Sequence, residues 1–145
     1  MYSDKLDKLK NVKNSDLEYF NLDDRIVFGK VVDIFDANTC CIIFLLDSLV
    51  FKFNCKLNNT KINKNSNKSD LFKLVTDIEK YSNDINISEN NTKLLQIKLN
   101  NFSKDGFLLI DLSELNSDKI FNKILIDDKK LSKYDFGKNK FKFNN

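Results

Sequence analysis

The sequence predicts a mainly β domain of the α+β class, built on a five-stranded barrel with two or three short helices. Three observations support this prediction. Runs of β-branched and aromatic residues follow each other closely between residues 30 and 57, and two further runs lie between 93 and 112. Two other segments have apolar residues at helical spacing. At 145 residues, the chain is long enough for one domain with a single core.

The first three predicted strands are residues 30–35, 40–46 and 49–57, which are separated by short segments of turn-forming Asp, Asn and Ser. Only the third strand alternates clearly between apolar and polar residues, so we expect one of its faces to meet solvent. The second strand is apolar on both faces and should lie inside. If Asp47 and Ser48 form a two-residue hairpin turn, Cys40 lies opposite Cys55.

A polar loop at 58–69 should follow these strands. We then expect a helix that starts at a Ser69 cap, ends near Tyr81 and has one apolar face, formed by Leu71, Leu74, Val75 and Ile78.

The second half of the chain predicts two more strands and a helix. A loop at 82–92 precedes a fourth strand at 93–102, and a turn that contains Gly106 leads to a fifth strand at 107–112. Ser117 should cap a helix over 118–125, whose inner face holds Ile120, Phe121, Ile124 and Leu125. The stretch from 129 onward predicts an ordered coil and then a free end.

Three strands, a helix, two strands and a helix follow the order of a Greek-key barrel of the OB type. A half-open α+β sandwich would use the same elements. We expect residues 1–24 to form a short or frayed helical lead-in, or a solvated tail, with 16–25 against the barrel edge. Residues 25–138 then form the domain, and 139–145 a flexible tail.

Composition limits the classes of function. A net charge of +3 is too small to require a nucleic-acid partner, and Arg25 is the only arginine. Abundant Lys, Asn and Ile without proline is typical of AT-rich coding sequence. No apolar run reaches the length of a membrane span and no signal peptide is evident, so we expect an intracellular, cytoplasmic protein without a membrane partner, more readily a monomer than an oligomer.

The three cysteines are Cys40, Cys41 and Cys55, an odd number in a chain without histidine. This count argues against a disulfide scaffold and against a zinc site with histidine ligands. Buried, reduced thiols are the expected state. A redox role or a site of three thiolates stays open, since Cys40 and Cys55 are expected to face each other.

Several segments together resemble the staphylococcal nuclease (thermonuclease) family, particularly the versions carried by large DNA viruses with AT-rich genomes. They are KVVDIFDANTCCIIF, FKFNCKL, KLLQIKLNNFSKDGFLLIDL and KYDFGK, in that order and within residues 16–138. The resemblance implies an OB-type barrel. It also implies a nuclease site in which carboxylates hold calcium and two arginines clamp the scissile phosphate, with a glutamate assigned as the base.

The positions that match this site carry other residues. Asp36 and Thr39 match the first turn, but Asn38 stands at the position of a calcium ligand and Lys56 at that of the first arginine. Phe107 stands at that of the second arginine. The acidic segment after the third strand is missing, because no Asp or Glu occurs between Ser48 and Ser69. We therefore interpret these positions as remnants of a degenerate active site, without catalytic residues, metal or cofactor.

The favoured hypothesis is a non-catalytic module that binds DNA, RNA or a protein. Its candidate nucleic-acid contacts are four lysines and one aromatic ring: Lys52, Lys56, Lys61, Lys64 and Tyr134. Lys68 adds a further positive charge to the same lysine-rich stretch. The plainer interpretation is that the lysines are solvated surface charge and that Tyr134 is a packing residue.

Two hypotheses from other classes stay open. The first is a weakly active, metal-dependent nuclease that uses calcium and an altered site, such as Asp36 with Asp33 or Asp111 and a lysine. The second is a structural or interaction protein of a virus or virion. It would dock through the fifth strand or through a Phe-rich tail, formed by Phe136, Phe141 and Phe143.

Overall fold

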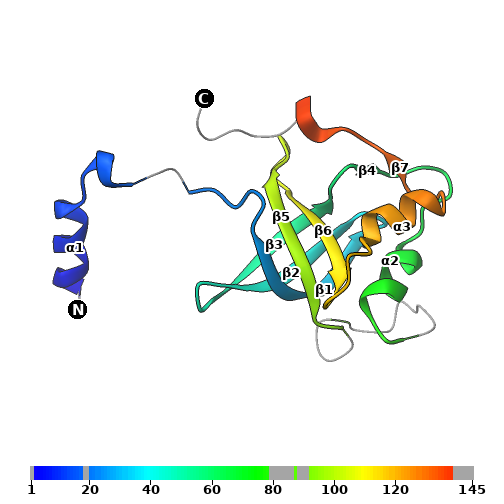
Figure 1. Ribbon diagram of the computed structural model, residues 1–145, viewed down its shortest axis with the longest axis horizontal. Coiled ribbons are helices and arrows are strands. Elements are labelled where there is room, and N and C mark those ends of the chain that lie inside the picture. The colour runs from blue at the N-terminus through cyan, green and yellow to red at the C-terminus, as the bar shows by residue number, and fades with distance from the viewer. Residues whose placement is uncertain (1, 18–19, 79–86, 88–91, 139–145) are drawn as a thin grey trace.

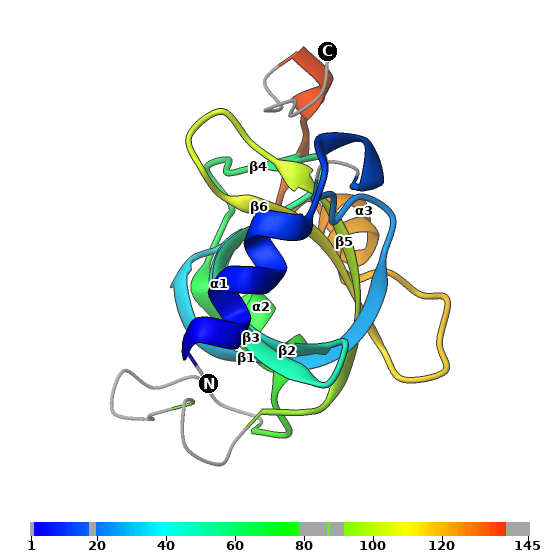
Figure 2. The same cartoon turned by 90° about the vertical axis from the view of Figure 1, so that its left-hand side faces the viewer.

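A computed structural model describes residues 2–17, 20–78, 87 and 92–138. Five strands close into a barrel in the order β1-β2-β3-β6-β5, and the three α-helices lie outside it (Figure 1). All neighbouring strands in the barrel are antiparallel except β3 and β6, which run parallel. The predicted mainly β fold of OB type with short helices is therefore confirmed. Figure 2 shows the barrel nearly end-on, with α1 in front of it.

The first three strands form two consecutive hairpins, as predicted. They are β1 (Ile26–Asp36), β2 (Thr39–Leu46) and β3 (Leu49–Leu57), with β2 between the other two. Asp47 and Ser48 both have positive φ, at 52° and 68°, as a two-residue hairpin turn requires. Cys40 pairs with Cys55 in this register, which confirms the expected juxtaposition.

Strand β1 begins four residues earlier than predicted. Gly29 interrupts the apolar pattern of the sequence, but it lies inside the strand. A Cβ at this position would be 2.3 Å from the backbone oxygen of Ile43, so no larger residue fits between β1 and β2. The early part of β1 also pairs with β5, which closes the barrel. The glycine that interrupts the apolar pattern is thus part of the strand.

The predicted helix at 70–81 was wrong at both ends. Helix α2 spans Lys68–Val75, and Asn67, not Ser69, is its N-cap, since the Asn67 side chain accepts a hydrogen bond from the Ser69 amide at 2.9 Å. The helix stops at Val75 because Thr76 adopts an extended conformation and bridges to Thr92. Tyr81 and most of the predicted loop at 82–92 fall outside the described residues.

The remaining strands of the barrel are β5 (Leu95–Phe102) and β6 (Leu108–Glu114), each shifted by one or two residues from its prediction. The turn between them contains Gly106 at a φ of 91°, as expected. The loop at 58–69 holds an unpredicted strand, β4 (Thr60–Lys61), which pairs with β7 (Ser132–Lys133) in the segment predicted as coil. Two residues are too few to show a strand period.

Helix α3 spans Phe121–Asp127 and starts three residues later than predicted. Ile120 is extended and bridges to Ser113, and the Ser117 hydroxyl accepts from the Lys119 amide as part of a turn, so Ser117 caps no helix. Ile120 is consequently exposed and does not belong to the inner face. At the chain ends, α1 (Tyr2–Asn11) and the 3-10 turns η1 (Asn14–Asp16) and η2 (Phe136–Lys138) complete the described elements.

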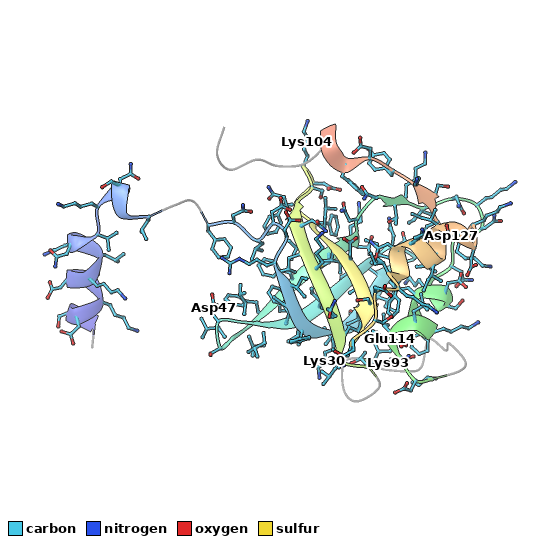
Figure 3. The ribbon with its side chains drawn as sticks, in the orientation of Figure 1. Lys30, Asp47, Lys93, Lys104, Glu114 and Asp127 are labelled. Carbon is cyan, nitrogen blue, oxygen red and sulfur yellow. The ribbon has the colours of Figure 1, made fainter. Side chains whose placement is uncertain are left out.

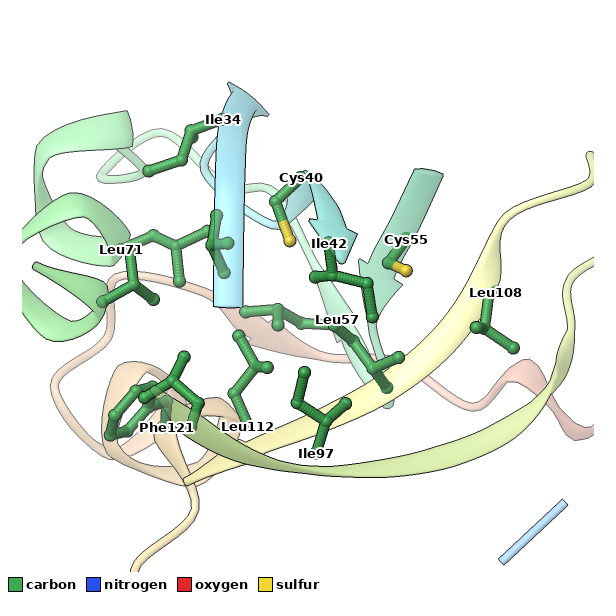
Figure 4. Close-up of a cluster of buried hydrophobic side chains, with 14 of the residues drawn as sticks. Ile34, Cys40, Ile42, Cys55, Leu57, Leu71, Ile97, Leu108, Leu112 and Phe121 are labelled. Carbon is green, nitrogen blue, oxygen red and sulfur yellow. The ribbon is translucent and has the colours of Figure 1, made fainter. Parts of the chain in front are cut away.

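The barrel interior holds one apolar core, to which α2 and α3 contribute (Figure 4). Leu71, Phe72 and Val75 of α2 are buried in it. All three cysteines are free thiols and buried, and burial raises the pKa of Cys40 to about 12. These thiols behave as small apolar residues of the core.

Candidate binding cleft at the end of the barrel

A cleft of about 470 Å³ opens at one end of the barrel, between segments that are far apart in the sequence. The β1–β2 turn forms one wall, and the β5–β6 turn at residues 103–107 forms another. The end of β3, strand β4 and the segment after β7 complete it. Figure 3 labels Lys104 at this end of the molecule. The β1–β2 and β5–β6 turns correspond to the two loops at which OB barrels commonly bind ligands.

Most of the remnant positions lie together in this cleft. Asp36, Asn38, Thr39 and Lys56 all contribute to its lining. Phe107 lies directly beside it, because the Lys56 ammonium group sits 4.7 Å from the centre of the Phe107 ring. The structure therefore brings together the five residues that the family resemblance placed at one site.

Asn38 is buried and fully engaged in hydrogen bonds. Its side-chain nitrogen donates to the Thr60 hydroxyl at 3.3 Å, and its side-chain oxygen accepts from the Thr39 hydroxyl at 3.0 Å. Its backbone oxygen accepts from the Leu57 amide at 2.8 Å. Asn38 thus joins the β1–β2 turn to the end of β3 and to β4, which is a structural role.

Lys56 pairs with Asp105 of the β5–β6 turn, which was not among the predicted site residues. The Lys56 nitrogen lies 3.5 Å from an Asp105 carboxylate oxygen. The Ser103 hydroxyl donates to the same carboxylate and accepts from the Phe107 amide at 3.1 Å. The Ser103 hydrogen bond lowers the pKa of Asp105, and the charge of Lys56 lowers it further.

The lysine candidates divide into two groups. Lys61 lines the cleft, and Lys104, which sequence reasoning missed, contributes from the β5–β6 turn. Lys52 points outward from the middle of β3, opposite Ile43, and Lys64 is exposed in the loop after β4. Neither Lys52 nor Lys64 belongs to the cleft lining in the part of the chain that the structure describes.

Tyr134 lines the cleft and also a smaller adjoining hollow of about 290 Å³. Its ring packs edge-on against Phe136, with 4.7 Å between the ring centres. Its backbone amide donates to the backbone oxygen of Asn59 at 2.9 Å. Phe136 itself is buried. Tyr134 is therefore held at the border between the two hollows.

The other carboxylates of the altered catalytic sets do not line the cleft. Asp33 is exposed on β1, and Asp111 faces Asn122 of α3, whose side chain donates to it at 3.0 Å. Neither lines the cleft with Asp36. Arg25 lies at the opposite part of the barrel, 3.8 Å from Asp47 at the tip of the β2–β3 hairpin.

The residues of the cleft do not fit calcium. Asp36 and Asp105 are its two carboxylates, and Asp105 is neutralised by Lys56. The Asn38 side-chain oxygen already accepts from Thr39. Within the described residues, no three cysteine, aspartate or glutamate side chains come together so as to hold a metal ion.

Comparisons of the chain with protein-family models, curated proteins and solved structures found no match. None of the described helices is long and apolar enough to cross a membrane.

Proposed function

We propose that this chain is a non-catalytic binding module, a degenerate relative of the staphylococcal nuclease family that holds single-stranded nucleic acid in its cleft. The observation that carries the proposal is the position of the cleft between the β1–β2 and β5–β6 turns. OB barrels bind oligonucleotides at the corresponding loops.

The side chains of the cleft match the chemistry of a single strand. Lys61 and Lys104 are exposed at its rim, and Lys56 lies within it, so three ammonium groups stand against two carboxylates. Lysines of this kind bind backbone phosphates without reading sequence. Tyr134 supplies a ring against which an unpaired base can stack.

The absence of catalysis follows from the same residues. A lysine at position 56 lacks the two-pronged geometry of a guanidinium group, and its charge is shared with Asp105. Arg25, the only arginine of the chain, lies at the hairpin tip. Loss of a single charge-stabilising group typically lowers an enzyme's rate by roughly 10² to 10³, and here both arginines are replaced.

Fluorescence anisotropy with a labelled single-stranded oligothymidylate tests the proposal. We expect binding at low salt, with a slope of log K against log salt of about −1.4 if Lys61 and Lys104 meet phosphates while Lys56 stays paired with Asp105. The double variant Lys61→Glu/Lys104→Glu should bind roughly tenfold more weakly or worse. Incubation with calcium, magnesium or manganese should leave the oligonucleotide intact.

The control is Lys73→Glu/Lys119→Glu, which changes the net charge equally but alters exposed lysines outside the cleft. This variant should bind like the wild type. Equal loss in both double variants would show a diffuse charge effect rather than a site. No binding at low salt would overturn the proposal, and shortened products would overturn the absence of catalysis.

A further inference from the structure

An apolar face lies on the outside of the barrel near the tip of the β2–β3 hairpin. Phe28, Leu45 and Val50 are direct neighbours across β1, β2 and β3, yet they are 59%, 53% and 68% exposed. Ile26, two residues before Phe28 and on the same face of β1, extends this row at 61% exposure, whereas the equally exposed Leu49 lies on the opposite face of β3 from Val50. We call Ile26, Phe28, Leu45 and Val50 the hairpin face. Contiguous exposed apolar residues of this kind mark interaction surfaces.

A second set of exposed apolar residues lies in the N-terminal segment, of which the structure describes residues 2–17 and 20. Leu6 and Leu9 are three positions apart on α1, and the set continues beyond the helix: Val12, Leu17 and Phe20. The described residues include fifteen exposed large apolar side chains. Five belong to this segment and four to the hairpin face, so the two surfaces account for nine of the fifteen.

The N-terminal segment joins the barrel close to the hairpin face but does not fold back onto it. Leu22 is buried in the barrel core, at 3% exposure. Asp24 pairs with Lys98 at 3.6 Å, and Arg25 pairs with Asp47 at the hairpin tip. The segment therefore leaves the barrel beside the hairpin face. In Figures 1 and 3, α1 stands clear of the barrel, on the side toward which the Asp47 tip points.

We propose that the hairpin face is covered by the N-terminal segment of a second copy of this chain, and that two copies exchange these segments reciprocally. One chain carries both apolar surfaces, and the segment extends outward from its own anchored barrel, which leaves it available to a neighbour. Reciprocal exchange buries both surfaces twice and closes the assembly at two subunits. Lys104 and the cleft lie away from the Asp47 tip, so exchange leaves the cleft open (Figure 3).

Light scattering across a concentration series tests the exchange. We expect the full chain to reach twice its 16.9 kDa mass. Leu9→Lys in the segment and Val50→Asp on the hairpin face should each give a monomer. Both positions are about 70% exposed, so neither change disturbs the core. Leu115→Asp, an exposed apolar position outside both surfaces, should remain a dimer.

Mixing the two single variants separates exchange from a segment that folds back on its own barrel. In a mixed dimer, one wild-type segment meets one wild-type face, and the other interface pairs Lys with Asp. We therefore expect the mixture to recover dimers. A wild-type chain that stays monomeric, single variants that stay dimeric, or a mixture that stays monomeric would each overturn the proposal.

Discussion

At the scale of single residues, the neighbours of Asp105 in the cleft set its pKa. The Ser103 hydrogen bond has a larger lowering effect on the pKa of Asp105 than the charge of Lys56. Ser103→Ala should therefore raise the pKa of Asp105 toward the usual aspartate range, and Lys56→Met, which removes both a nearby positive charge and a hydrogen bond, should also raise it. A pH titration of the Asp105 carboxyl carbon by NMR measures both shifts.

The sign of the pH dependence follows from the lowered pKa. Asp105 stabilises the folded cleft above the usual aspartate pKa, and this contribution is lost as the pH falls through the folded value. Asp105 is largely exposed, so water screens the effect. Equal pKa values in the wild type and in Ser103→Ala would contradict this view of the cleft.

The sequence could predict only part of this cleft. The family resemblance placed Asp36, Lys56 and Phe107 together, and they are neighbours in space. Asp105 and Lys104 were missed because Ser, Asp and Gly are common in any turn, so this segment carries no sign that its side chains line a cleft. The approach of Asp105 to Lys56 depends on the pairing of β3 with β6, which no local pattern reveals.

At the scale of elements, Asn122 attaches α3 to the barrel. Its side-chain nitrogen donates to the backbone oxygens of Asn58, at 3.0 Å, and Ile110, at 2.9 Å, and its oxygen accepts from the Leu112 amide at 3.3 Å. Asn122 is buried, so its removal leaves backbone groups without partners.

Asn122→Ala should therefore lower the free energy of unfolding by about 2 to 4 kcal/mol, since each buried polar group left without a partner costs about 1 to 3 kcal/mol. Urea denaturation measures the change. Lys123→Ala alters the next, exposed residue of the same helix and should have little effect. Similar stability of the two variants would show that α3 is held by its apolar contacts alone.

Element prediction succeeded where a periodic pattern was long enough. The five barrel strands have seven to eleven residues each, and all were found. Both ends of β3 were predicted correctly, and each of the other four has an error of one to four residues at one end or both. Both helix starts were misplaced, because nearby serines suggested caps that Asn67 and an extended Ile120 replace. Strands β4 and β7 were missed because tertiary pairing, not local sequence, defines them.

At the scale of the whole molecule, the barrel separates two surfaces with different chemistry. The charged cleft lies at the end where the β1–β2 and β5–β6 turns meet, and the hairpin face lies near the Asp47 tip. Between them, the core is continuous, from Leu22 to Leu131. Changes at one surface should therefore leave the other intact, provided that the barrel itself stays folded.

The point at which the N-terminal segment joins the barrel can be located by truncation. Leu22, just before β1, belongs to the barrel core, whereas Leu17 is 67% exposed. Removal of residues 1–20 should therefore leave the stability of the monomer nearly unchanged. Removal of residues 1–24 also removes Leu22, and loss of a buried leucine costs about 2 to 5 kcal/mol.

Urea denaturation of both truncated chains, at a protein concentration low enough to keep the wild type monomeric, measures this difference. Leu22→Ala in the full chain should reproduce most of the loss, and Leu17→Ala should not. If removal of residues 1–20 were as destabilising as removal of 1–24, the barrel would need contacts from α1. The segment would then serve its own barrel, which would contradict its exchange between two copies.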